Sequence, residues 1–261
     1  MSKQGEIDYP NKLSKEGVEW LYTKPFGISN LLVRHLHDFT VILSILDLPK
    51  HSKVIDLACG SGWTSIYLAK SGFKVKGVDI SAKMIDIARK RAESESEGIE
   101  LEFESADIED YMDDEKYDAV TIYDALHHCD NWHKVIKNAA AMLKKGGKLL
   151  MIEPGKGHQK ANNSKKAIDK YDVSENDLDV VKIKQECLNN GFIKVKTYFS
   201  TLGPLIGKTG ILGLGNMIRR IILHKYFREN RIILLAINGN GQSIGKGIGD
   251  GANDSVAVAT K

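Results

Sequence analysis

Two acidic side chains and two glycines lie close together in the first third of the chain, at a spacing that suits a nucleoside ligand. Asp56 ends a short apolar run, and Gly60 and Gly62 follow it. A second acid, Asp79, comes about twenty residues after Gly60. A carboxylate at the end of a strand accepts hydrogen bonds from both hydroxyls of a ribose, and glycine lets the backbone approach a ligand closely. The spacing therefore predicts a site for a ribose-containing molecule.

The elements around these residues are predicted to be two strands and a helix. Residues 54–57 form an apolar run, and residues 64–70 carry apolar side chains at helical spacing. Residues 74–79 predict a second strand that ends in Asp79. The new helix directs its unpaired backbone N–H groups at the glycine turn, where a ligand would lie. The alternative is an ordinary strand-to-helix turn, in which the glycines serve only the tight geometry.

The stretch 54–62 resembles the first motif of class I S-adenosylmethionine-dependent methyltransferases, in which an acid, three residues and Gly-x-Gly follow one another. Dinucleotide-binding proteins usually carry Gly-x-Gly-x-x-Gly without the acid, and Ser65 replaces the third glycine in this chain. The resemblance is good over 50–155 and only in outline elsewhere. It implies an α/β fold with a Rossmann-like, doubly wound, mostly parallel seven-stranded sheet, and S-adenosyl-L-methionine as cofactor.

The expected cofactor contacts follow from position and from this resemblance. Asp79 is expected to bind the ribose, and Asp56 either orients the glycine turn or meets the ammonium group through water. The resemblance implies that Asp107 takes the exocyclic amine of adenine, although acids crowd this region and a solvated face is the alternative. The full predicted set is Asp56, Ala58, Gly60, Gly62, Asp79, Ile80, Met84, Asp107, Ile108 and Tyr123. Ile80, Met84 and Ile108 pack on the adenine, and Tyr123 lines the methionine arm.

Two histidines after the predicted fourth strand are the candidate catalytic residues. Methyl transfer is an in-line displacement, so most of the catalysis can come from holding the acceptor behind the methyl group. A base helps only if the acceptor loses a proton. His127 and His128 are placed for that role, and capping of local backbone is the alternative. No metal is expected, because a zinc site from His127, His128, Cys129 and His133 would need adjacent residues of one turn to converge.

The predicted acceptor is a hydroxyl of a small molecule or a glycan. Enzymes that methylate exocyclic amines in DNA carry an Asn/Asp-Pro-Pro-Tyr/Phe stretch where this chain has residues 123–126, Tyr-Asp-Ala-Leu. The net charge is only +3 and no basic RNA-binding module is present, so nucleic acid is not expected as a partner. Residues 123–172, with Glu153-Pro154-Gly155 and His158, loosely resemble methyltransferases found with bacterial polysaccharide-synthesis enzymes. A non-catalytic cofactor-binding protein is the alternative function, which the intact motif set disfavours.

The 261 residues, 42% hydrophobic and 27% charged, suit one α/β domain with additions. We expect an N-terminal lid and helix over 1–48, the cofactor domain over 49–200, a helical cap over 201–253 and the last strand over 254–261. Within them, Ser174 is expected to cap a helix reaching about residue 190, after an irregular stretch over 156–173. The rival assignment makes 231–237 the last strand and 239–261 a glycine-rich tail. The sequence leaves both open.

Residues 214–236 combine a broad apolar stripe with five basic side chains. Such a helix suits peripheral contact with an anionic membrane surface. The alternative is that the stripe packs on the domain or on a second copy of the chain as a homodimer. Three cysteines and the absence of a signal peptide or an apolar run of membrane-spanning length predict reduced thiols and a cytoplasmic location.

Overall fold

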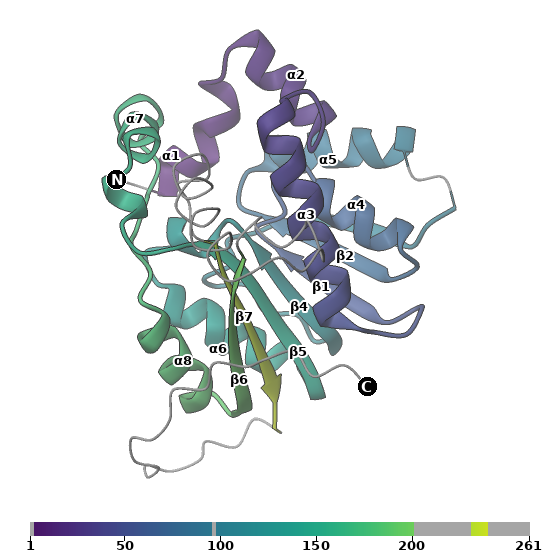
Figure 1. Cartoon of the computed structure of the whole chain (residues 1–261). Helices are drawn as coiled ribbons and strands as arrows, with labels where there is room; N and C mark the ends of the chain where they lie inside the picture. Colours follow the sequence, from purple (N-terminus) through teal and green to yellow (C-terminus); the bar gives the residue numbers. More distant parts are fainter. Residues whose placement is uncertain (1–2, 96–97, 201–230, 240–261) are drawn as a thin grey trace, which may run out of the picture.

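A single mixed sheet passes through the centre of the computed structural model, which describes residues 3–95, 98–200 and 231–239 (Figure 1). Its strand order is β3-β2-β1-β4-β5-β7-β6. The strands β1 to β5 pair in parallel, and β7 is antiparallel to both β5 and β6. Their bounds are β1 Lys53–Leu57, β2 Lys74–Asp79, β3 Leu101–Ser105, β4 Tyr117–Tyr123, β5 Leu143–Pro154, β6 Phe192–Ser200 and β7 Arg231–Asn238. The predicted seven-stranded, mostly parallel sheet is confirmed.

Helices cover both faces of this sheet, as parallel strands require. One face carries α3 Ser29–Leu46, α4 Trp63–Lys70 and α5 Ala82–Glu95, and the other carries α6 Trp132–Met142 and α8 Val180–Asn189 (Figure 1). Ile42 and Leu46 of α3 are buried in one apolar core, and Val135 and Ile136 of α6 in the other. The central strands are buried from both sides, which explains their continuous apolar runs.

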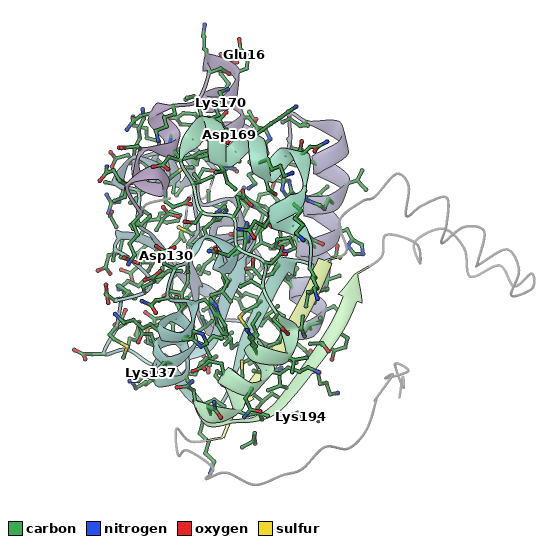
Figure 2. All side chains as sticks on the ribbon, turned by 90° about the vertical axis from the view of Figure 1, so that its left-hand side faces the viewer. Glu16, Asp130, Lys137, Asp169, Lys170 and Lys194 are labelled. Atoms are coloured by element: carbon green, nitrogen blue, oxygen red, sulfur yellow. The ribbon has the colours of Figure 1, made fainter. Side chains whose placement is uncertain are left out.

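The strand order reverses between β1 and β4, and the carboxyl ends of these strands lie at one end of the molecule. In open α/β sheets ligands bind at such a reversal point. Three more helices gather at this end, α1 Lys3–Asp8, α2 Lys15–Thr23 and α7 Asn162–Tyr171, and α1 contacts α7. Figure 2 shows Asp169 and Lys170 of α7 near the same end as Glu16 of α2, with Lys194 of β6 toward the opposite end.

The structure decides between the two assignments of the seventh strand. Residues 231–238 form β7, so the strand of the rival assignment is confirmed, and the expectation that a helix reaches residue 236 is wrong. The glycine-rich tail that this assignment places after the strand lies outside the described residues beyond residue 239. Residues 232–236 are continuously apolar and buried between β5 and β6, a pattern that periodicity cannot distinguish from a buried helix. The rest of the predicted cap, the amphipathic stretch over 214–230 and the strand predicted at 254–261 lie outside the described residues.

The segment between β5 and β6 also differs from expectation. Residues 162–171 form helix α7 where an irregular stretch was expected. The next helix begins at Val180 instead of near Ser174, because Asp179 is its cap and accepts a hydrogen bond from the backbone N–H of Val181 at 2.9 Å. Within the residues that the structure describes, no helix is both long enough and apolar enough to cross a bilayer.

Candidate active site

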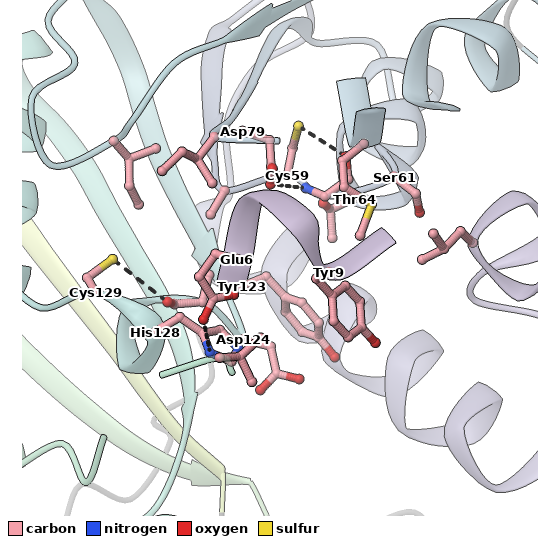
Figure 3. Close-up of a pocket in the computed structure, with 18 of the residues that line it drawn as sticks. Glu6, Tyr9, Cys59, Ser61, Thr64, Asp79, Tyr123, Asp124, His128 and Cys129 are labelled. Carbon is pink, nitrogen blue, oxygen red and sulfur yellow. Dashed lines mark hydrogen bonds and ion pairs between the residues drawn. The ribbon is translucent and has the colours of Figure 1, made fainter. Parts of the chain in front are cut away.

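A cavity of about 370 Å³ opens at the carboxyl ends of β1, β2 and β4, and the ribbon of α1 passes over it (Figure 3). It is lined by residues from the N-terminal helices, the turns after these strands and the segment around α7. Eight of the ten predicted cofactor residues line it, namely Ala58, Gly60, Asp79, Ile80, Met84, Asp107, Ile108 and Tyr123. Asp56 and Gly62 do not. Of the two candidate catalytic histidines, His128 lines the cavity and His127 does not.

Asp79 is held with both carboxylate oxygens oriented by the backbone. Its Oδ2 atom accepts a hydrogen bond from the N–H of Gly60 at 2.8 Å, and its Oδ1 atom accepts one from the N–H of Ser81 at 2.9 Å. Burial raises the pKa of Asp79 to about 6, the two backbone hydrogen bonds oppose that rise, and the charges of Glu6 and Asp56 add to it. Each oxygen keeps a further lone pair for a hydroxyl donor.

Asp56 supports the glycine turn from beneath instead of facing the cavity. Its side chain is buried and accepts hydrogen bonds from three hydroxyls, those of Thr64 at 2.6 Å, Ser65 at 2.7 Å and Thr121 at 2.8 Å. Thr64 and Ser65 belong to the first turn of α4, and Thr121 belongs to β4. Of the two roles considered for Asp56, the geometry therefore supports orientation of the turn.

The two motif glycines serve different purposes. Both have positive φ, 55° at Gly60 and 78° at Gly62. A Cβ atom at Gly60 would meet no atom within 4 Å, whereas one at Gly62 would lie 2.8 Å from Cβ of Ala88 and 2.9 Å from Cζ of Phe103. Gly60 therefore keeps the cavity open, and Gly62 lets the turn pack against α5 and β3. Ala58 also has positive φ, an unusual conformation that clusters at ligand sites.

Helix α1 reaches across the adenine end of the predicted site. The Nζ atom of Lys3 lies 2.6 Å from Asp107 and 2.8 Å from Glu109. The hydroxyl of Ser81 donates a hydrogen bond to the carbonyl of Ile7 at 2.9 Å. Sequence reasoning placed a lid in this region but did not find Lys3, because no local pattern links it to an acid more than a hundred residues away.

The other end of the cavity is lined by aromatic and basic side chains that sequence reasoning largely missed. Trp20, Lys24 and Arg34 come from the N-terminal helices, and Trp63 comes from α4. The Trp63 ring packs edge-on against Tyr123 with centroids 5.3 Å apart. The indole N–H of Trp20 is buried and has no hydrogen-bond partner among the described residues. A buried, unsatisfied donor in a cavity wall is placed to receive an anionic ligand group.

The histidines after β4 have different surroundings. His128 lies in the wall, its Nδ1 atom contacts the carbonyl of Ser174, and Glu6 of α1 is directed toward it at 3.4 Å (Figure 3). Burial alone would lower the pKa of His128, but Glu6 and Glu175 raise it to about 9. His127 is turned away, with Nδ1 2.7 Å from Oε2 of Glu153.

Cys129 and His133, the other two residues of the zinc set considered from the sequence, do not form a common site with His127 and His128. His133 pairs on the surface with Glu186 at 2.9 Å. All three cysteines are buried as free thiols, and burial raises the pKa of Cys59 and of Cys129 well above the ordinary value. A raised pKa keeps both thiols of the cavity wall protonated near neutral pH, which disfavours a nucleophilic role.

Comparison with known proteins shows similarity to methyltransferase domains. A family model described as a methyltransferase domain matches residues 54–147. The ubiquinone biosynthesis O-methyltransferase of Coxiella burnetii is 39% identical over 102 residues, which cover 39% of this chain and 43% of that protein. The chain thus matches less than half the length of this curated relative.

Two solved structures share the fold. The phosphoethanolamine N-methyltransferase 2 of Haemonchus contortus, in complex with S-adenosyl-L-methionine, superposes with a TM-score of 0.66 at 18% identity, over 92% of this chain and 60% of that one. The magnesium protoporphyrin IX methyltransferase of Synechocystis, with bound S-adenosylhomocysteine, gives 0.62 at 22% identity, over 89% and 97%. Residues 54–147 of this chain therefore match a methyltransferase domain, and the chain shares the fold of methyltransferases of known structure that bind S-adenosylmethionine or S-adenosylhomocysteine.

Proposed function

We propose that this chain transfers the methyl group of S-adenosylmethionine to an oxygen of a small-molecule acceptor. The observation that carries the proposal is the placement of Asp79 in the cavity wall, with both oxygens oriented by the N–H groups of Gly60 and Ser81. A carboxylate fixed in this way, on the strand next to the reversal point of the sheet, suits the two hydroxyls of a ribose.

The cavity residues fit the rest of the cofactor. Ile80, Met84 and Ile108 offer apolar surface for the adenine ring, and Asp107 offers an acceptor for its exocyclic amine next to Lys3. At the opposite end, the buried indole N–H of Trp20 suits the carboxylate of the methionine arm. Tyr123 lines the cavity between these ends. These assignments are the contacts that we propose for the cofactor.

S-adenosylmethionine supplies a methyl group bonded to a positively charged sulfur, which makes that carbon an electrophile. The contribution of this chain is to align an acceptor oxygen with that group and to exclude water. We assign contact with the acceptor to His128, because it lines the cavity beside Glu175 and Tyr171. His127 is not assigned this role, since its ring lies outside the cavity wall.

An oxygen acceptor is supported by the name of the curated relative, an O-methyltransferase. A glycan acceptor, membrane contact through the part of 214–236 that precedes β7 and pairing with a second copy are narrower proposals that rest on the sequence. Flotation with anionic liposomes tests the membrane contact, and absence of salt-sensitive association would reject it.

Calorimetry with S-adenosylmethionine, S-adenosylhomocysteine and NAD tests the cofactor, and release of S-adenosylhomocysteine with a panel of phenols and sugars tests the transfer. We expect binding of the first two ligands, no binding of NAD, and turnover with at least one hydroxyl acceptor. Binding of NAD in preference to S-adenosylmethionine would overturn the proposal. Cofactor binding without turnover of any acceptor would favour the non-catalytic alternative.

A further inference from the structure

A second cluster of titratable side chains lies behind His128, beyond the part of the cavity assigned to the cofactor. The Nε2 atom of His127 is 3.7 Å from Oε2 of Glu175, and the Nε2 atom of His158 is 2.6 Å from the same oxygen. One donor atom from each of the three residues lies within 4.8 Å of the other two. The residues come from the turn after β4, the turn after β5 and the segment before α8, so only the fold brings them together.

The three side chains of this cluster are largely shielded from solvent. The side chains of His127, His158 and Glu175 are 4%, 14% and 9% exposed. Among the described residues, the Oε2 atom of Glu175 has no partner with normal hydrogen-bond geometry, although two imidazole nitrogens approach it. The hydroxyl of Ser164 lies 3.4 Å from Nε2 of His158. Two imidazole nitrogens and a carboxylate oxygen thus converge on one small buried region.

His127 is also oriented in the way that a metal ligand is. Its Nδ1 atom lies 2.7 Å from Oε2 of Glu153, and Oε1 of Glu153 accepts hydrogen bonds from the backbone N–H groups of Ala125 at 3.1 Å and Leu126 at 2.9 Å. A carboxylate at Nδ1 keeps the proton on that nitrogen, which leaves the lone pair on Nε2 for a cation. Histidine ligands of metals almost always have such a partner.

We propose that His127 Nε2, His158 Nε2 and Glu175 Oε2 form a binding site for a divalent cation of the zinc class. Two imidazoles and one carboxylate are a donor set that zinc accepts, with a fourth position left for water or another oxygen. Two buried carboxylates, Glu153 and Glu175, balance the charge of a dication. Because Glu175 also lines the cavity, the open position lies next to the proposed acceptor region.

The test is zinc binding by the full chain, purified without a histidine tag and freed of metal with a chelator. Competition with a chromophoric chelator measures the affinity, and atomic spectroscopy after dialysis measures the stoichiometry. We expect one zinc per chain, with an affinity weakened about hundredfold or more by His158→Gln or Glu175→Gln. Glu153→Gln is expected to weaken zinc binding about 10–100-fold through the orientation of His127. The matched control is His133→Gln, which removes an imidazole from an exposed histidine–glutamate pair and is expected to bind zinc like the wild type.

Two results would overturn the proposal in favour of a metal-free ion-pair network. One is less than stoichiometric zinc on the wild-type chain, and the other is His158→Gln binding zinc as tightly as the wild type. If circular dichroism shows that the variants do not fold, Co²⁺ is added to the wild type to test the site. Four-coordinate Co²⁺ absorbs visible light much more strongly than hydrated Co²⁺, so the absence of strong bands would also overturn the proposal. These experiments measure only metal binding, so their outcome does not depend on whether the chain transfers a methyl group.

Discussion

The backbone N–H of Gly60 donates a hydrogen bond to Oδ2 of Asp79 over 2.8 Å, and this bond joins the two motifs of the proposed cofactor site. The glycine turn follows β1 and the acid ends β2, two strands that pair in parallel in register. Parallel neighbours bring their carboxyl ends to the same edge, so residues 19 positions apart in sequence become direct partners. The carboxylate proposed to bind the ribose is therefore oriented by the same turn that keeps the cavity open.

Replacing Asp79 tests the ribose assignment. Asp79→Ala removes two charge-assisted hydrogen bonds to the proposed ribose, so affinity for S-adenosylhomocysteine should fall by about 2–4 kcal/mol. Asp86→Ala serves as the control, because Asp86 is exposed on α5 and is 66% accessible. Calorimetry measures both variants. An unchanged dissociation constant for Asp79→Ala would remove Asp79 from the site.

The raised pKa of Asp79 predicts a pH dependence of cofactor affinity. The ribose hydroxyls bind the ionised carboxylate, and the pKa of this group in the free protein is about 6 because of burial. Below that pH a growing fraction of the free protein is protonated and must release the proton on binding. Affinity for S-adenosylhomocysteine should therefore be about tenfold weaker at pH 5 than at pH 7. Asp79→Asn should flatten this profile, and an equally steep profile in that variant would assign the dependence to another group.

Substitutions at the two motif glycines should differ in their main effect, which is on cofactor affinity at Gly60 and on stability at Gly62. Gly60→Val places a side chain in the open cavity, so cofactor affinity should fall about hundredfold or more, which is ~3 kcal/mol. The positive φ at Gly60 also strains this variant, so its affinity is measured on protein shown to be folded. Gly62→Ala places Cβ 2.8 Å from Ala88, so the free energy of unfolding should fall by about 1–3 kcal/mol. Urea unfolding and calorimetry on both variants measure the two effects. The reverse pattern would contradict the roles assigned to the glycines.

Asp56 should act on the stability of the turn. Asp56→Ala leaves the buried hydroxyls of Thr64, Ser65 and Thr121 without their shared acceptor, so the free energy of unfolding should fall by about 2–4 kcal/mol. Asp56→Asn keeps one acceptor oxygen and should cost less. Thermal unfolding without ligand measures this loss. A full loss of cofactor affinity at unchanged stability would instead place Asp56 in contact with the ligand.

His128 should affect turnover more than cofactor binding. With an acceptor that is methylated, His128→Ala should lower kcat about tenfold or more, while the dissociation constant for S-adenosylhomocysteine changes less than about twofold. His133→Ala, on the exposed face of α6, is the control. Steady-state kinetics and calorimetry supply the two readouts. Full activity of His128→Ala would show that His128 is not needed for turnover and that positioning of the acceptor by the rest of the cavity is sufficient.

The sequence alone determined the central fold and most of the residues proposed for the cofactor site. The strand-turn-helix unit at 53–70 and the acid at Asp79 are visible because strand runs, helical spacing and glycine turns are local patterns. Their spacing matches the methyltransferase motif, and eight of the ten residues predicted from it line one cavity. Short-range geometry in this region is dictated by neighbouring residues, so a linear pattern suffices to predict it.

Only the tertiary structure decided which polar side chains face that cavity and which lie behind it. Asp56 and Asp79 lie near the carboxyl ends of their strands, and His127 and His128 lie in the turn after β4. Asp56 and His127 nevertheless turn toward partners on other elements. The pairing of Lys3 with Asp107 joins positions 104 residues apart. Likewise, the place of residues 231–238 was set by pairing with β5 and β6, because an apolar run is compatible with a strand or a buried helix until a partner is present. Side-chain direction and long-range pairing depend on packing, which no local periodicity encodes.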